Sequence, residues 1–228
     1  MQETELAFAV PDDRADAVEQ AMRRAGARSA TIESHYVDTL DRRLAAAGLS
    51  LRLRKTGSLW EQTLKAPAGR DPATRHEHTV PRPGSWSAEG PPVDPRLHDG
   101  SPAARALAEA LRAADGNESG GLLAPSHASF VRRRTVTVAH GGAVIEVAFD
   151  RGEIRAGDRV LPIRELELEL KEGPRAALIA LARETVDQHR VWMQVASKSA
   201  RGDRLLHGDD VAGPRAVKSR PPELDKRM

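Results

Sequence analysis

The stretch from Glu165 to Lys171 reads E-L-E-L-E-L-K, and its carboxylates could hold metal ions. Carboxylates and leucines alternate there with a period of two, which is the period of a β-strand. One face of this strand would be apolar, and the other would carry three carboxylates roughly 6 to 7 Å apart. Like charges at this spacing repel, so they need opposing cations, a metal ion or screening by water. A half-buried strand with its charged face in solvent is the simplest interpretation unless the rest of the chain supplies partner charges.

Charge segregates by sign on the other segments that are predicted to be strands. Each has one face of Leu, Val, Ile or Phe and one charged face. The acidic faces carry Glu3 and Glu5, Glu146 and Asp150, and Glu165, Glu167 and Glu169, whereas the basic faces carry Arg52 and Arg54, Lys65 and part of the run 132–134. Charged faces that simply meet water would mix both signs, so the segregation favours two opposed charged walls.

The elements that must position these walls include helices with apolar stripes. One helix is predicted to begin after Pro11 and end at Gly26, and another to follow Pro174. Apolar strand faces can cover these stripes if the strands form a barrel with helices outside. Buried charges must be paired or coordinate a metal, so the interior is predicted to be a hydrated tunnel. Its acidic wall suits Mg²⁺ or Mn²⁺, and its basic wall suits phosphate oxygens.

The composition narrows the classes of partner. The chain has 228 residues, with 35 Lys and Arg against 33 Asp and Glu, so no strong overall charge favours nucleic acid or a membrane surface. Aromatic residues make up only 3%, which argues against stacking on bases. Absence of cysteine excludes a disulfide scaffold, and no apolar run approaches the ~18 residues of a spanning helix. We expect a cytoplasmic protein without nucleic-acid or membrane partners.

Eight short motifs, taken in order, resemble the CYTH superfamily of triphosphate tunnel metalloenzymes across residues 1–208. They are Glu3-x-Glu5, H-Y-V-D-T at 35–39, L-R-L-R at 51–54, Q-T-L-K at 62–65, Arg75-x-Glu77, I-E-V-A-F-D-R-G-E at 145–153, E-L-E-L-E-L-K at 165–171, and S-K-x-x-R-G at 197–202. The likeness is greatest to bacterial inorganic triphosphatases. It implies an α+β fold, a closed antiparallel eight-stranded β-barrel with helices packed outside. Residues 209–228 resemble a linker or tail that leads to an absent helical CHAD domain.

The resemblance also implies roles for individual residues. The implied ligands of Mg²⁺ or Mn²⁺ are Glu3, Glu5, Glu146, Asp150, Glu165, Glu167 and Glu169. Substrate binding falls to Arg52, Arg54, Lys65, Arg75, Arg133, Arg134, Lys198 and Arg201. Catalysis is expected to involve Glu3, Glu5, Arg54 and Lys65. Alternation with Val136 and Val138 favours Arg133 as the inward arginine of its run, although the choice within 132–134 stays open.

The implied function is metal-dependent hydrolysis of inorganic triphosphate to diphosphate and phosphate. Ala7 stands where the first-strand signature of the family, E-x-E-x-K, has a lysine, which predicts slow turnover or binding without efficient cleavage. One alternative is therefore a polyphosphate-binding module that serves a CHAD domain. Another is hydrolysis of an organic triphosphate, such as thiamine triphosphate or a nucleotide. The sequence leaves open the preferred chain length, the metal and the presence of a homodimer.

Overall fold

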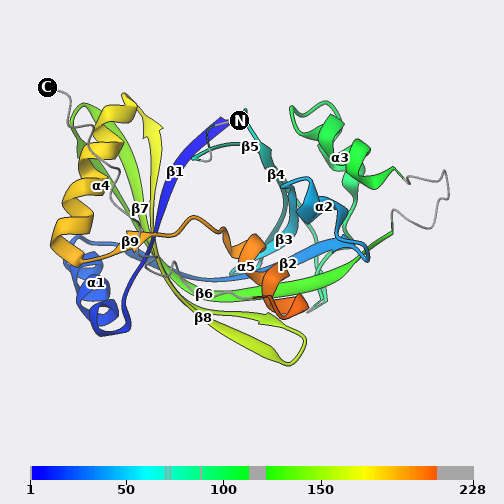
Figure 1. The fold of residues 1–228 in the computed structure, drawn as a ribbon, viewed down its shortest axis with the longest axis horizontal. Helices are drawn as coiled ribbons and strands as arrows, with labels where there is room; N and C mark the ends of the chain where they lie inside the picture. Colours follow the sequence, from blue (N-terminus) through cyan, green and yellow to red (C-terminus); the bar gives the residue numbers. More distant parts are fainter. Residues whose placement is uncertain (1, 70, 72, 88, 113–121, 210–228) are drawn as a thin grey trace, which may run out of the picture.

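Eight antiparallel strands close into a barrel in the computed structural model, which describes residues 2–69, 71, 73–87, 89–112 and 122–209 (Figure 1). The order around the barrel is β5-β4-β3-β2-β6-β7-β8-β1, and pairing of β1 with β5 closes it. The strands are β1 (Gln2–Ala9), β2 (Arg28–Thr39), β3 (Ser50–Thr56), β4 (Leu59–Pro67), β5 (Thr74–Pro81), β6 (Leu123–His140), β7 (Ala143–Ala156) and β8 (Arg159–Glu172). A short ninth strand, β9 (Trp192–Met193), pairs with β1 outside the barrel. The predicted fold class is confirmed. Residues 210–228, nearly all of the predicted linker, lie outside the described residues.

Helices pack on the outside of the barrel in two groups. Helices α1 (Asp12–Arg24) and α4 (Arg175–His189) lie side by side against β1, β7 and β8 (Figure 1). On the opposite side lie α2 (Arg43–Ala46), α3 (Ala104–Leu111) and the 3₁₀ helix η1 (Pro95–His98). None of the helices described is long and apolar enough to cross a membrane.

The apolar strand faces form the core, as the alternating sequence predicts. Leu166 and Leu168 of the E-L-E-L-E-L-K stretch are buried beneath α1 and α4 with Phe8 and Phe149. The glutamates between these leucines must therefore face the barrel interior, because neighbouring side chains on a strand point to opposite sides. Burial of the apolar face thus fixes the direction of the charged face.

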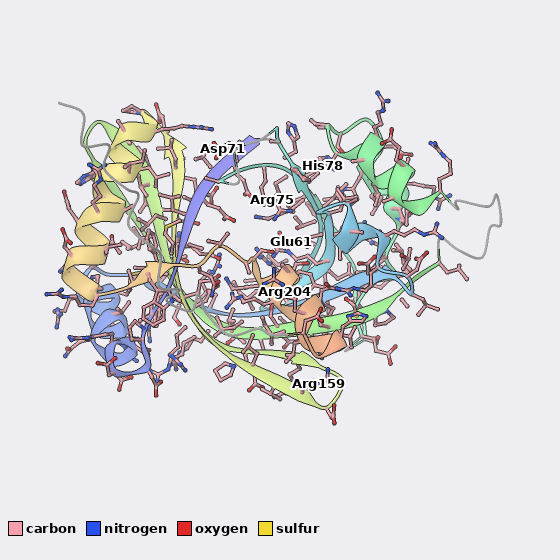
Figure 2. The ribbon with its side chains drawn as sticks, viewed as in Figure 1. Glu61, Asp71, Arg75, His78, Arg159 and Arg204 are labelled. Carbon is pink, nitrogen blue, oxygen red and sulfur yellow. The ribbon has the colours of Figure 1, made fainter. Side chains whose placement is uncertain are left out.

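Helix α5 (Lys198–His207) packs over one end of the barrel interior. Its Leu205 contacts an apolar cluster that contains Ile32, Val131, Ile154 and Ile163. These four residues share the inward phase of the cavity residues on their strands. Arg159 fastens the same C-terminal end of α5 and donates to the carbonyls of Leu205 (2.8 Å) and Leu206 (3.1 Å). Figure 2 labels Arg159 at the end of the β7–β8 hairpin.

A buried histidine joins η1 to the outer face of β4 and β5. His98 is fully buried, and its ring nitrogens lie 3.0 Å from the amide nitrogen of Gln62 and 3.0 Å from Nδ1 of His78. The pKa of His98 is lowered to about 4. Burial is the main cause and His78 adds to it, while Asp94 and Asp99 act in the opposite direction. His98 is therefore neutral at pH 7 and accepts a hydrogen bond from Gln62.

We expect the protein to lose stability as the pH falls from 6.5 towards 4. In this window an unfolded His98 is protonated and the folded one is not, so the unfolded state binds more protons. The loss from this residue is of the order of 2–3 kcal/mol. Urea unfolding near neutral and acid pH should show a smaller loss in His98→Gln than in the wild type. His207→Gln, exposed at the end of α5, serves as the control. Equal losses in His98→Gln and the wild type would contradict the assignment.

Candidate active site

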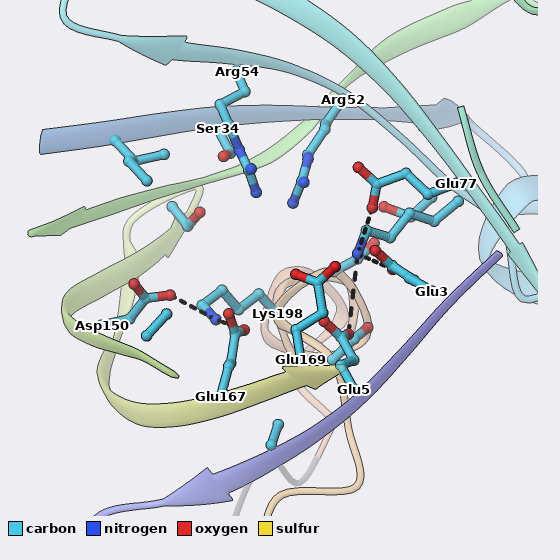
Figure 3. A pocket seen from close by; sticks show the side chains of 18 of the residues that line it. Glu3, Glu5, Ser34, Arg52, Arg54, Glu77, Asp150, Glu167, Glu169 and Lys198 are labelled. Carbon is cyan, nitrogen blue, oxygen red and sulfur yellow. Dashed lines mark hydrogen bonds and ion pairs between the residues drawn. The ribbon is translucent and has the colours of Figure 1, made fainter. Parts of the chain in front are cut away.

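A cavity of about 520 Å³ lies inside the barrel, with acidic and basic side chains on opposing walls (Figure 3). Arg52 and Arg54 point into it from one wall, towards Glu167 and Glu169 on the other (Figure 3). The predicted site residues that line it are Glu3, Glu5, Arg52, Arg54, Lys65, Arg75, Arg133, Glu146, Asp150, Glu165, Glu167, Glu169 and Lys198. Motifs scattered over the chain therefore meet in one space.

Arg134 lies outside this cavity, which corrects its expected place in the tunnel. Arg133 faces inwards, so its neighbour on the same strand faces outwards. There Arg134 donates to Glu19 of α1 (3.1 Å). Three other arginines donate to the same carboxylate: Arg23, Arg132 and Arg151. Burial would raise the pKa of Glu19, but these arginines outweigh burial and lower it to about 2. Arg134 therefore anchors α1 to the barrel.

A first cluster of carboxylates lies where β1, β5, β7 and β8 meet. Its members are Glu3, Glu5, Glu77, Glu146 and Glu169. Glu169 is the direct cross-strand partner of Glu5 on one side and of Glu146 on the other. Lys65 pairs with Glu3 and with Glu77 (2.8 Å), and Lys171 with Glu169 (2.8 Å). Five carboxylates thus face two ammonium groups, counted over the described lining, so negative charge is in excess.

Crowding in the first cluster changes the pKa of Glu3. The pKa of Glu3 is raised to about 7. Burial is the main cause, Lys65 opposes it, and the nearby Glu77 and Glu5 add to the increase. Burial would lower the pKa of Lys65, but Glu5, Glu77 and Glu3 outweigh it and raise that pKa. The pKa of Glu3 is thus raised mainly by burial, and the pKa of Lys65 is raised by the surrounding negative charge.

A second cluster, Asp150, Glu165 and Glu167, lies deeper along β7 and β8. Each of its carboxylates offers an oxygen within 4.8 Å of the others, a spacing that could hold a metal ion. The ammonium of Lys198 contacts Asp150 (2.9 Å), Glu167 (2.6 Å) and Glu165. Two guanidinium groups complete the surroundings: Arg133 contacts Asp150 and Glu167, and the buried Arg201 contacts Glu165. Arg201 is not part of the cavity lining, and it reaches the site through Glu165.

The basic wall has the opposite imbalance. The Nε atoms of Arg52, Arg54 and Arg75 are buried and have no hydrogen-bond partner among the described residues. The pKa of Arg54 is lowered to about 10, mainly by burial and also by the neighbouring positive charges of Arg52 and Arg133. Glu61, 3.7 Å away, is too weak a partner to reverse this shift. Unsatisfied guanidinium donors at the wall of a polar cavity suit an anion.

Glu77 and Tyr36 also line the cavity, although no site role was predicted for either residue. Glu77 binds Lys65, and its strand phase with Arg75 was the signal that could have included it. The hydroxyl of Tyr36 lies 3.4 Å from Nη1 of Arg52. Its inward direction depends on pairing of β2 with β3 and β6, which a single strand pattern does not reveal.

Gly202 allows α5 to approach the barrel closely enough to place Lys198 in the cavity. The ring of His127 stacks on Tyr36 with centroids 4.4 Å apart, and its other face lies against Gly202. A Cβ at position 202 would lie 2.0 Å from Cδ2 of His127. Since His127 is confined by Tyr36, a larger residue must push α5 away.

We expect Gly202→Ala to destabilise the protein by about 3 kcal/mol or more, because the added methyl group overlaps a buried ring. Urea unfolding measures the change, and Arg204→Ala, an exposed position on the same helix (Figure 2), is the matched control. His127→Ala in the Gly202→Ala background should recover part of the lost stability. Wild-type stability of Gly202→Ala would show that the close packing is not needed.

A known family model matches the part of the chain that forms the barrel. The model described as the CYTH domain matches residues 1–202. The chain belongs to the CYTH domain family. The match covers all nine strands and the first residues of α5, including Lys198 and Arg201. The family resemblance that the sequence motifs indicated is thereby confirmed.

Solved structures show the same CYTH fold at low sequence identity. A Hippeastrum protein named as an adenylyl cyclase, with a dominant triphosphatase activity, superposes with a TM-score of 0.57 and 14% identity, over 92% of this chain and 97% of that chain. A Pyrococcus horikoshii protein gives 0.51 and 14%, over 87% and 96%. A Bacillus halodurans protein named as an adenylate cyclase gives 0.50 and 14%, over 82% and 89%. At this identity the likeness establishes the fold.

Proposed function

We propose that this CYTH protein hydrolyses inorganic triphosphate to diphosphate and phosphate with Mg²⁺ or Mn²⁺, as in bacterial inorganic triphosphatases. The observation that carries the proposal is the pair of arginines Arg52 and Arg54, each with a buried and unsatisfied Nε atom, opposite an acidic wall. The dominant triphosphatase activity described for the Hippeastrum relative supports the same reaction class.

The first cluster has the chemistry that a divalent metal needs. Its donors are carboxylate oxygens, which Mg²⁺ and Mn²⁺ prefer, and its negative charge exceeds the charge of Lys65 and Lys171. Glu3, Glu5, Glu146 and Glu169 would hold the ion. When bound, a divalent metal would polarise phosphoryl oxygens as a Lewis acid.

The basic residues bind and orient the phosphate chain. Arg52 and Arg54 line the cavity and would bind phosphate oxygens, and Arg75 extends the same wall. These guanidinium groups also stabilise the charge that develops on the leaving diphosphate. Lys65 lies between Glu3 and Glu77 and can contact a phosphate at the border between the two walls.

Phosphate release from tripolyphosphate in the presence of Mg²⁺ or Mn²⁺ tests the proposal directly. We expect release that stops with a chelator, that exceeds release from ATP or thiamine triphosphate, and that falls by about 100-fold in Glu5→Gln. Glu184→Gln, exposed on α4, is the matched control. Undiminished release by Glu5→Gln would rule out this site.

A polyphosphate-binding module is the second candidate, and Ala7 favours it. Ala7 lines the cavity as the cross-strand partner of Glu167, so β1 presents no ammonium group at this point. Retention of long polyphosphate without metal-dependent release would select this candidate. An organic triphosphate has less support, because Tyr36 and His78 are the sole aromatic rings of the described lining, and each packs on another histidine.

We also propose a further domain, a cellular location and an oligomeric state for this protein. The tail beyond residue 209 would join the barrel to a helical CHAD domain, and the protein would act in the cytoplasm without nucleic acid or membrane. A homodimer is compatible with this setting. Mass measurement of the natural full-length protein in solution tests both the length of the chain and its oligomeric state.

A further inference from the structure

The second cluster already contains a full set of cations. Three carboxylates, those of Asp150, Glu165 and Glu167, face three basic groups from Lys198, Arg133 and Arg201, counted over the described residues. The side chains of Asp150 and Glu165 are 1% and 4% exposed, so water can do little to screen them. Buried carboxylates that lost these partners would be strongly destabilising. The cluster is therefore balanced without a metal.

Lys198 occupies the centre of this cluster. Its ammonium contacts all three carboxylates, and these are the same three whose oxygens lie close enough together to hold a metal ion. The ammonium therefore lies where a metal ion bound by these three carboxylates would have to lie.

Lys198 is held at this position by helix α5 and not by a strand of the barrel. Lys198 is the first residue of α5, and the hydroxyl of Ser197 caps the helix by accepting from the amide of Ala200 (3.2 Å). The direct cross-strand neighbours of Glu167 are Ala7 and Ala148, both of which line the cavity. No charged side chain of the neighbouring strands therefore lies directly beside Glu167 in the register.

We propose that the ammonium of Lys198 is the resident cation of the second cluster and excludes divalent metal from Asp150, Glu165 and Glu167. Metal then binds through the first cluster alone, and the chain takes up one ion where its carboxylates would suffice for two. This inference rests on the divalent metal of the proposed function. It concerns binding and not turnover, so a failure to hydrolyse triphosphate would leave it standing.

The inference is tested by titrating the purified protein with Mn²⁺ alone. Calorimetry and electron paramagnetic resonance count the bound ions. We expect one bound Mn²⁺ in the wild type and two in Lys198→Met, because the substitution frees three carboxylates. Lys171→Met is the matched control: it removes an ammonium from the first cluster, so binding should tighten while the stoichiometry stays at one. Two ions in the wild type would overturn the proposal.

Lys198→Met could fail to fold without metal, so a second comparison keeps the wild-type lysine. Glu167→Gln should bind Mn²⁺ with wild-type affinity, whereas Glu5→Gln should lose about 10- to 100-fold. Both changes replace a carboxylate by an amide of the same shape, one in each cluster. Equal losses of Mn²⁺ affinity in the two variants would show that the second cluster binds the metal despite Lys198, and would overturn the proposal.

Discussion

Replacement of Arg54 by alanine is expected to lower the hydrolysis of inorganic triphosphate by about 100-fold or more without lowering the stability of the protein. Arg54 has a buried Nε without a partner, and its lowered pKa of about 10 shows that the fold disfavours its charge. The causes are burial and the neighbouring positive charges of Arg52 and Arg133. Its removal relieves repulsion in the empty cavity and deprives the phosphate of a donor.

The two effects should be measured on the same preparation. Phosphate release from tripolyphosphate reports the loss of activity, and urea unfolding at pH 7 should give an unfolding free energy equal to or above that of the wild type. Arg28→Ala, at an exposed position on β2, is the matched control and should change neither quantity. A marked loss of stability in Arg54→Ala would mean that the arginine serves the fold, and wild-type release would mean that it does not bind the substrate.

This opposition between function and stability explains why the charged walls were visible in the sequence. A barrel that served only stability would not place like charges in phase on one strand face. In Glu165–Lys171 the leucines are fixed by the core beneath α1 and α4, so period two alone gave the direction of the glutamates. The same argument favours Arg133, because Val136 and Val138 pack outwards against the core, although alternation alone did not remove Arg134 from the expected substrate-binding residues.

Other parts of the fold depend on contacts that one segment cannot reveal. The apolar alternation predicts a strand from Phe130 to Ala139, whereas β6 begins at Leu123. Its first part contains Pro125 and small polar residues, which indicate a loop; in the structure Pro125 sits where the register with β2 shifts, so its missing N–H costs little. This part pairs with β2, and its His127 contacts Gly202 of α5, which comes more than seventy residues later.

The β7–β8 hairpin was also longer than predicted. Strand β7 continues beyond Asp150 to Ala156, and β8 begins at Arg159, six residues before the predicted start. At Gly152 the carbonyl oxygen of Phe130 lies 1.9 Å from where a Cβ would be, so the continued strand requires glycine there. The motif around residues 197–202 was recognised, yet its helix was not, because its cap and its apolar contact with the barrel are tertiary features.

Replacement of Glu169 by glutamine is the second change from which we expect a large effect. Glu169 lies between Glu5 and Glu146 in the sheet register, so it is the central carboxylate of the first cluster. An amide keeps the shape of the side chain but removes a negative charge and weakens one oxygen ligand. We expect Mn²⁺ affinity to fall by about 10- to 100-fold and phosphate release at limiting metal by at least as much.

The control for this prediction is Glu172→Gln, an exposed position at the end of the same strand. Mn²⁺ titration and phosphate release over a range of metal concentrations should show wild-type behaviour for this control. If Glu169→Gln acts through the metal, excess Mn²⁺ should restore a large part of the activity, because mass action refills a weakened site. Loss of activity at unchanged Mn²⁺ affinity would contradict metal ligation and place Glu169 against the phosphate chain instead. The response to excess metal therefore separates a metal ligand from a residue that only faces the substrate.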